Sequence, residues 1–388
     1  MVTFIILAFL AALSLGLTMW QVAVAVRFPL HRRIAEMKFT PAVSVLKPLK
    51  GCDVATRECL QSWFTQNYPG GLELRFGVAS EQDPVCQIVR ALIREHPGCD
   101  AQLIICDKTL GPNAKVSKLA CLELLATHDI VCVSDADVWV PPDFLANAVA
   151  PLRDASVGLV NCFYRFATPA NLAMRWEAFA VNADFWSQVL QSLSLQPMHF
   201  ALGAAMLMPR TRLQAIGGFQ QLVDHVADDY QLGNRIMRQH ARVVVSPIVV
   251  ECRTGPISFG EVWKHQLRWA RTIRVCQPWP FFCSIIGNAS LWPMLWAAAR
   301  PGWPSFAGAG LCLAVRWAAG VFLEGKMTGK HNLLTGAMAV AKDFLQFALW
   351  AMAFASRKVS WRGVDYRVKP GGKLVKVSEG TPAPASPA

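Results

Sequence analysis

Two aspartates one residue apart, Asp135 and Asp137, follow a short apolar run, and this pattern constrains the fold more than any other in the chain. The run Ile130–Val133 is typical of a buried strand, and Pro141 and Pro142 keep that strand from continuing. Ligands of open α/β sheets bind beyond the carboxyl ends of the strands. Two carboxylates there predict a small anionic site, which suits a hard divalent cation and, through the cation, a diphosphate. The same pair is also typical of a plain solvated turn.

The chain around this pair alternates short β-rich runs with helical patterns, from Pro41 to about Gly217. This alternation is the rhythm of βαβ units on a parallel sheet. The sequence predicts strands over 43–46, 72–78, 103–106, 130–133 and 204–209, and helices over 54–65, 84–95, 115–126 and 230–239. A doubly wound, mainly parallel α/β sheet is the simplest architecture for this order.

Apolar segments at both ends of the chain predict attachment to a membrane. Hydrophobic residues make up 53% of the 388 residues and charged residues only 16%, an apolar excess for a purely soluble protein. The uncharged run Phe4–Val26 has the length of a membrane span, so residues 1–27 are expected to form a retained anchor. Phe281–Ala299, Phe306–Leu323 and Leu333–Ala355 are expected to form membrane helices within 281–356.

Basic residues after the first apolar run predict its orientation. Arg27, His31, Arg32, Arg33 and Lys38 follow the run directly, which by the positive-inside rule leaves the next segment in the cytosol. We therefore expect an integral protein of the inner or cytoplasmic membrane with a cytosolic catalytic domain.

That domain is expected to span residues 40–278 and to include an interfacial helix near 260–275. Three spans after it would leave the basic tail, residues 357–388, outside, against the same rule. One C-terminal segment is therefore expected to be re-entrant. The composition of Thr381–Ala388 predicts a disordered end.

Charge and cysteine usage exclude several classes of protein. The net charge of +12 gathers beside the apolar spans and in the tail, which favours an anionic membrane leaflet and not nucleic acid as the partner. The twelve cysteines are scattered singly without a C-x-x-C spacing, which indicates reduced thiols and neither a disulfide framework nor a zinc site.

A second acidic pair follows a glycine turn. Gly217 and Gly218 follow the predicted strand 204–209, and Asp228 and Asp229 open the predicted helix 230–239. Acids at a helix start are favoured by the helix dipole and are often only caps, so both a structural and a catalytic role stay open.

An arginine stripe comes next. Arg268 and Arg271 stand at i and i+3 beside Trp269, on one face of a helix. This pattern also fits an interfacial helix whose arginines extend toward the headgroups, and both interpretations can hold together.

In chain order, these motifs resemble the membrane-bound inverting glycosyltransferases of the GT-A kind, most closely the ceramide glucosyltransferase family, and are similar to hopanoid-associated glycosyltransferases. The resemblance covers about Pro41–Arg274 and includes the segment Gly111–Leu119. The matching residues are Asp83 in Glu81–Pro84, the pair Asp135 and Asp137, Asp229 in Ala227–Tyr230, and Arg268 with Trp269. One position departs from the pattern, because the family has Gln or Arg where this chain has His265.

The resemblance implies a GT-A-like fold that uses a UDP-sugar and either Mg²⁺ or Mn²⁺. Asp229 would be the general base, assisted by Arg268 and Trp269, and Asp137 would hold the cation. The residues expected to contact the donor nucleotide sugar are Lys50, Asp83, Lys115 and Asp135. A single transfer would then move one sugar, glucose first, to the hydroxyl of a membrane lipid, ceramide first.

Three alternatives accompany this hypothesis. A hopanoid or another lipid could accept the sugar, with UDP-N-acetylglucosamine or UDP-glucuronate as donor. A non-catalytic scaffold or lipid transporter could keep the fold, although it has no reason to keep Asp83, Asp137, Asp229 and Arg268 together. A processive polysaccharide synthase is disfavoured, because the predicted C-terminal bundle is too small for a polymer channel.

Overall fold

A computed structural model describes residues 1–36, 38–356, 358–361 and 364–376. The strands are β1 (Val43–Pro48), β2 (Leu72–Val78), β3 (Asp100–Ile105), β4 (Ile130–Ser134), β5 (Val138–Trp139), β6 (Val157–Phe166), β7 (Ala205–Pro209), β8 (Arg242–Cys252), β9 (Lys358–Trp361), β10 (Val364–Val368) and β11 (Leu374–Lys376).

The α-helices are α1 (Val2–Arg27), α2 (Thr56–Phe64), α3 (Val85–Glu95), α4 (Ala114–Glu123), α5 (Phe144–Val149), α6 (Leu172–Phe179), α7 (Trp186–Leu193), α8 (Arg210–Ala215), α9 (Asp228–Arg238), α10 (Phe259–Cys276), α11 (Pro278–Cys283), α12 (Leu291–Ala299), α13 (Trp303–Thr328) and α14 (Leu334–Ala355). Short helical turns are η1 (Ala150–Arg153), η2 (Ala180–Phe185, a π-helix), η3 (Phe219–Leu222), η4 (Ser284–Gly287) and η5 (Pro370–Gly372).

The main sheet confirms the predicted fold class. Within the described residues it has eight strands in the order β3-β2-β1-β4-β7-β6-β8-β5. The pairs β3-β2, β2-β1, β1-β4 and β6-β8 are parallel, whereas β7 runs antiparallel to β4 and β6, and β5 runs antiparallel to β8. The sheet is therefore mixed, and its parallel half is the part that the helix–strand alternation predicted.

Two cores cover the two faces of this sheet. On one face, strand residues such as Val45 and Val160 pack with Trp63 of α2 and Phe144 of α5. On the other face, helices α4, α7 and α9 pack on the sheet, and this core continues into Leu323 of α13. The sheet and the C-terminal helices thus share one apolar interior.

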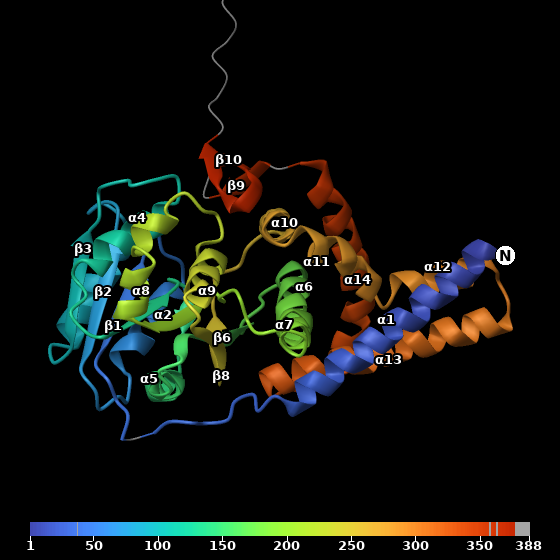
Figure 1. Ribbon diagram of the computed structural model, residues 1–388, viewed down its shortest axis with the longest axis horizontal. Coiled ribbons are helices and arrows are strands. Elements are labelled where there is room, and N and C mark those ends of the chain that lie inside the picture. Colours follow the sequence, from blue (N-terminus) through green and yellow to red (C-terminus); the bar gives the residue numbers. More distant parts are fainter. Residues whose placement is uncertain (37, 357, 362–363, 377–388) are drawn as a thin grey trace, which may run out of the picture.

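The long apolar helices gather at one end of the molecule, away from the sheet (Figure 1). In the part of the chain that the structure describes, α1, α13 and α14 are long and apolar enough to cross a membrane. The segment from α11 to α12 adds a fourth only if its two parts, bent by 55° to each other, count as one span. Such a bend fits the expected re-entrant segment, whose placement in a membrane stays a prediction.

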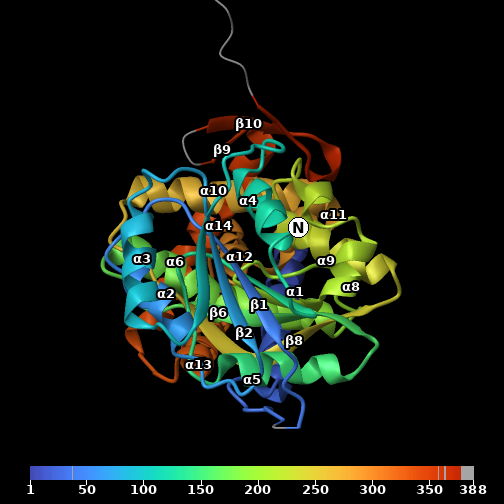
Figure 2. The same cartoon turned by 90° about the vertical axis from the view of Figure 1, so that its left-hand side faces the viewer.

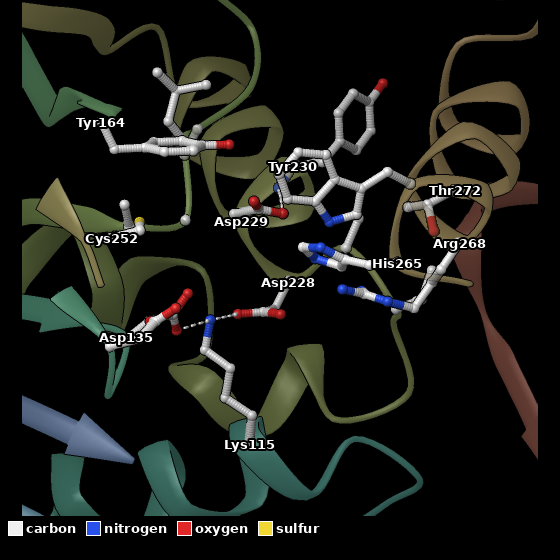
Figure 3. A pocket seen from close by; sticks show the side chains of 18 of the residues that line it. Lys115, Asp135, Tyr164, Asp228, Asp229, Tyr230, Cys252, His265, Arg268 and Thr272 are labelled. Atoms are coloured by element: carbon white, nitrogen blue, oxygen red, sulfur yellow. Dashed lines mark hydrogen bonds and ion pairs between the residues drawn. The ribbon is translucent and has the colours of Figure 1, made fainter. Parts of the chain in front are cut away.

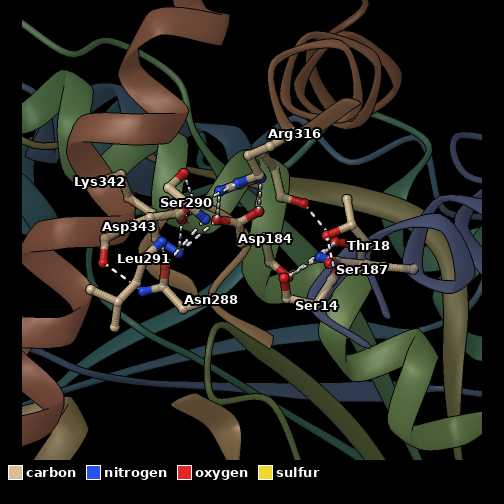
Figure 4. A network of polar contacts seen from close by, with 12 residues as sticks. Ser14, Thr18, Asp184, Ser187, Asn288, Ser290, Leu291, Arg316, Lys342 and Asp343 are labelled. Carbon is tan, nitrogen blue, oxygen red and sulfur yellow. Dashed lines mark hydrogen bonds and ion pairs between the residues drawn. The ribbon is translucent and has the colours of Figure 1, made fainter. Parts of the chain in front are cut away.

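One continuous helix, the α6–α7 helix, consists of α6, η2 and α7 and lies between the sheet and the long helices (Figure 1). Its connection to them is a buried cluster of charges (Figure 4). Arg316 of α13 binds Asp184 of η2 at 2.8 Å and Asp343 of α14 at 2.9 Å, and Lys342 binds Asp184 at 2.6 Å. Two cations thus balance two carboxylates, which is how charges are tolerated in an apolar interior.

The basic tail is partly folded. Residues 358–376 include a three-stranded sheet, β9, β10 and β11, which lies above α10 in Figure 2. Its small core is shared with Val226 and Ala227, just before α9, and with Cys276 of α10. The sequence predicted a basic tail here and assigned it no strands, and the predicted disordered end, Thr381–Ala388, lies outside the described residues.

Candidate active site

A cavity of about 850 Å³ opens at the carboxyl ends of the parallel strands (Figure 3). The turn after β4, the start of α4, the start of α9 and one face of α10 line it. Of the residues predicted from the sequence, the cavity is lined by Lys50, Lys115, Asp135, Asp137, Asp229, Arg268 and Trp269. Motifs far apart in the chain therefore meet at one place.

Lys115 connects the two acidic motifs. Its Nζ lies 2.8 Å from Oδ1 of Asp135 and 3.2 Å from Oδ2 of Asp228. The side chain of Asn113 caps α4 by accepting hydrogen bonds from the main-chain N–H of Lys115 and of Val116, so the helix start is fixed. Burial lowers the pKa of Lys115, but the carboxylates of Asp135 and Asp228 outweigh burial and hold that pKa above its ordinary value.

Asp229 begins α9 beside the cavity. One of its oxygens accepts a hydrogen bond from the N–H of Tyr230 at 2.7 Å, and the other lies where a side chain on Gly203 would come within 2.9 Å. A glycine at 203 therefore leaves space for the carboxylate. Burial, and then the neighbouring Asp228 carboxylate, raise the pKa of Asp229 to about 6. A carboxylate with such a pKa is a stronger base than an exposed one and is still mostly ionised at pH 7.

Asp137 and Asp135 form an acidic turn suited to a cation. Burial, and then the charge of Asp135, raise the pKa of Asp137 to about 6. The negative charge of the two carboxylates is therefore not fully compensated by the protein. Within the described ranges, no three carboxylate, imidazole or thiol groups gather that could hold a metal ion without help. Mg²⁺ commonly uses one or two carboxylates and takes its other ligands from water and substrate phosphates, so this pair fits such a cation.

Helix α10 presents His265, Arg268 and Trp269 to the cavity. The ring of His265 lies edge-on to that of Trp269, with centroids 4.6 Å apart. Nδ1 of His265 lies 2.6 Å from Oε1 of the buried Glu177 in α6, and Gln266 donates to the same oxygen at 2.9 Å. The position that departs from the family pattern is therefore held in place by Glu177 of the α6–α7 helix.

Asp83 stands apart from the other predicted residues, because it does not line the cavity. Both of its carboxylate oxygens accept the N–H of Gly51 at 3.0 Å, and one also accepts the N–H of Val85 at the start of α3. Gly51 lines the cavity next to Lys50, so Asp83 shapes the wall that carries Lys50.

Sequence reasoning missed three contributions to the site. Glu177 gave no signal, because its partner is distant in the chain. Lys47 directly follows the predicted strand 43–46 and was given no role, yet it is fully buried below the acidic turn. Burial lowers its pKa to about 8, so it is mostly charged at neutral pH. The apolar side of the cavity, from Tyr164, Phe166, Phe185, Val189 and Phe200, was not predicted either.

The chain belongs to Glycosyl transferase family 21, whose sequence pattern matches residues 4–374.

Curated relatives match only parts of the chain. Ceramide glucosyltransferase 1 of Caenorhabditis elegans is 23% identical over 228 residues, which are 56% of this chain and 47% of that protein. Ceramide glucosyltransferase of Candida albicans is 36% identical over 122 residues, or 29% of this chain and 22% of the relative. The chain spans about half the length of the Caenorhabditis elegans relatives that it matches.

Among solved structures, the chain is similar to the mannosyltransferase PcManGT from Pyrobaculum calidifontis, solved in complex with GDP-Man and Mn²⁺. That chain is 21% identical, with 89% of this chain and 92% of that chain covered and a TM-score of 0.48.

Proposed function

We propose that this protein transfers one sugar, glucose first, from a UDP-sugar to the hydroxyl of a membrane lipid, ceramide first. The observation that carries the proposal is the cavity itself. Asp229, the proposed base, lines it together with the acidic turn and basic side chains, and part of its apolar side belongs to the α6–α7 helix, which contacts the long apolar helices α1 and α13. Curated relatives named ceramide glucosyltransferases support the choice of sugar and lipid.

The donor would occupy the polar side of the cavity. Asp137, aided by Asp135, would hold Mg²⁺ or Mn²⁺, and a bound cation offsets negative charge on a departing diphosphate. Lys115 and Arg268 also line the cavity, and their side chains would add positive charge to that of the cation. Lys50 and the wall shaped by Asp83 would contact the nucleoside.

The acceptor would enter along the apolar side. Phe185 of η2 and Val189 of α7 line the cavity, and between them Ser187 ties the α6–α7 helix to α1, because its Oγ accepts from Gln21 at 2.6 Å. A lipid chain can follow such a path from the bilayer, while its hydroxyl reaches Asp229. Trp269, which lies 6.4 Å from the Phe185 ring, would close the wall around the sugar.

Asp229 would take the proton from the acceptor hydroxyl as the hydroxyl oxygen attacks the anomeric carbon. The bond from that carbon to the diphosphate breaks in the same displacement, so the anomeric configuration inverts. The products are a lipid glycoside, UDP and a proton that Asp229 passes to water.

Mass spectrometry of lipids from cells with and without the gene tests the proposal. One glycolipid should be missing without the gene, and its fragments identify both the sugar and the lipid. A missing hexosylceramide supports ceramide and glucose, whereas a missing glycosylated polycyclic lipid replaces the acceptor and keeps the reaction. Identical lipid profiles, with the gene expressed, would contradict the proposal.

A further inference from the structure

Lys47 is a buried lysine that the proposed mechanism does not use. It lies below the acidic turn, which comprises residues Ser134–Val138. Strand β1 places Val43 and Val45 in the core beneath α2, and side chains alternate along a strand, so Lys47 points to the same apolar face. Its side chain is fully buried. A buried ammonium is costly unless its hydrogens are bound and its charge is compensated, so its partners indicate its role.

The partners of Lys47 belong to the acidic turn and to α2. Nζ donates to the main-chain carbonyl of Asp135 at 2.7 Å and to Oγ of Ser134 at 3.3 Å. It also lies 4.6 Å from the ring centroid of Trp63. Asp135 is thus held at two points, by Lys115 at its carboxylate and by Lys47 at its carbonyl.

The neighbouring carbonyls of the turn are also bound by groups outside it. The carbonyl of Asp137 accepts from the N–H of Arg253 at 2.9 Å and from the thiol of Cys59 at 3.3 Å. The carbonyl of Val138 accepts from the indole N–H of Trp63 at 3.2 Å. The backbone of the turn is therefore fixed by contacts to its carbonyls, while Asp137 itself lines the cavity.

We propose that Lys47 is a positioning residue of the donor site, which fixes the acidic turn from below and supplies a positive charge beneath its two carboxylates. Two ionised carboxylates one residue apart repel each other, and a strand-borne cation lowers the cost of holding both in place before a ligand arrives. Neutral Cys59 and Trp63 supply hydrogen bonds of the same kind but no such charge. This inference rests on the proposed function, because it takes the turn to be the place where the donor binds.

The test compares Lys47→Met, which removes the charge and keeps the length of the side chain, with the wild-type protein in detergent. Hydrogen exchange without ligand should become faster in peptides covering residues 134–139 and stay unchanged in those covering β2 and β3. Calorimetry with UDP and Mn²⁺ should show an affinity about 10–100-fold lower, as for other groups that hold metal-binding residues in place. The affinity for UDP without metal should fall less.

Ser44→Ala is the matched control. Ser44 lies on the same strand, is fully buried and donates to Glu73, but it is at the other end of β1 from the turn. This variant should lose stability without faster exchange in residues 134–139 and without weaker UDP binding. Equal losses of affinity in both variants would mean that Lys47 acts only through general stability.

Wild-type binding separates this inference from the proposed function. If the wild-type protein does not bind UDP with Mn²⁺, the donor site is wrong, and exchange of the turn still decides whether Lys47 holds it. If the wild-type protein binds and Lys47→Met binds equally well, the positioning role is wrong. If Lys47→Met does not fold, Lys47→Gln replaces it, because this variant keeps a hydrogen-bond donor and removes only the charge; unchanged exchange in residues 134–139 and unchanged UDP affinity there would overturn the inference.

Discussion

Nζ of Lys115 lies 2.8 Å from Oδ1 of Asp135, although the two residues come from different elements, the start of α4 and the end of β4. The same ammonium reaches Asp228 at the start of α9, so one side chain joins three elements around the cavity. The acidic turn and the base candidate Asp229 are in this way parts of a single charged site, which explains how motifs far apart in the sequence can act together.

The raised pKa of Asp229 predicts the pH dependence of turnover. Its folded-state pKa of about 6 exceeds the ordinary value of 3.8, and a general base must be ionised to act. The rate of transfer should therefore rise with pH through about 6, level off above about 7, and fall close to tenfold per pH unit below that range. A pH profile of turnover at saturating donor checks this. A rate that stays flat from pH 5 to 8 would contradict the assignment.

Removal of divalent cations should abolish turnover, because hard cations choose carboxylate and phosphate oxygens. EDTA should stop transfer, and added Mn²⁺ or Mg²⁺ should restore it. Asp137→Ala should weaken UDP binding chiefly when metal is present, as calorimetry with and without Mn²⁺ can measure. Full activity in the presence of EDTA would show that transfer does not need a divalent cation.

The buried cluster around Arg316 should be essential for stability. Among the ion pairs of the described residues, Arg316→Met leaves Asp184 and Asp343 with Lys342 as their cation, and loss of one partner from a buried ion pair costs about 3–5 kcal/mol. Thermal unfolding in detergent should show a clearly lower midpoint. The exposed Arg300, changed to Met, is the control and should shift the midpoint little. Equal midpoints for the two variants would mean that the cluster does not tie the α6–α7 helix to the long helices.

The side of the membrane can be tested with protease. In sealed, right-side-out cells or spheroplasts, the region Pro41–Pro278 should be spared, and in permeabilised cells it should be cut. The basic residues after α1 and the free cysteines are the reasons. Cleavage of this region in intact cells would overturn the predicted topology. A tag after Ala388 that is cut only on permeabilisation would place the tail inside as well.

Sequence reasoning predicted the parallel half of the sheet because its strands and helices alternate regularly. The strands β6 and β8 were not predicted; β6 lies within the alternating region and β8 beyond it, and their pairing joins residues that are distant in the chain. The tail sheet was missed for a similar reason, since its core is completed by Val226 and Cys276, which belong to the catalytic domain.

The residues of the candidate site also divide into those that local sequence predicts and those that it does not. Acidic and basic residues in short motifs, such as Asp135 and Arg268, could be recognised from local sequence, and the structure brings them to one cavity. Glu177 and Lys47 could not, because the first matters only through its contact with His265 and the second only through a main-chain carbonyl of the acidic turn. Local sequence carries no sign of contacts that are made by the folding of distant segments.

Transfer of a labelled sugar to lipid by the wild-type protein and by Asp229→Asn tests the central claim most directly. Purified protein in lipid nanodiscs would receive Mn²⁺, a lipid extract, and in turn labelled UDP-glucose, UDP-N-acetylglucosamine and UDP-glucuronate. One of these donors should label the organic phase with the wild-type protein. Asp229→Asn should reduce the rate by about 10²–10⁴-fold while UDP affinity stays nearly unchanged, because a general base contributes about that much and does not hold the nucleotide. Label transfer within a few-fold of wild type in Asp229→Asn, or no transfer from any donor, would contradict the account.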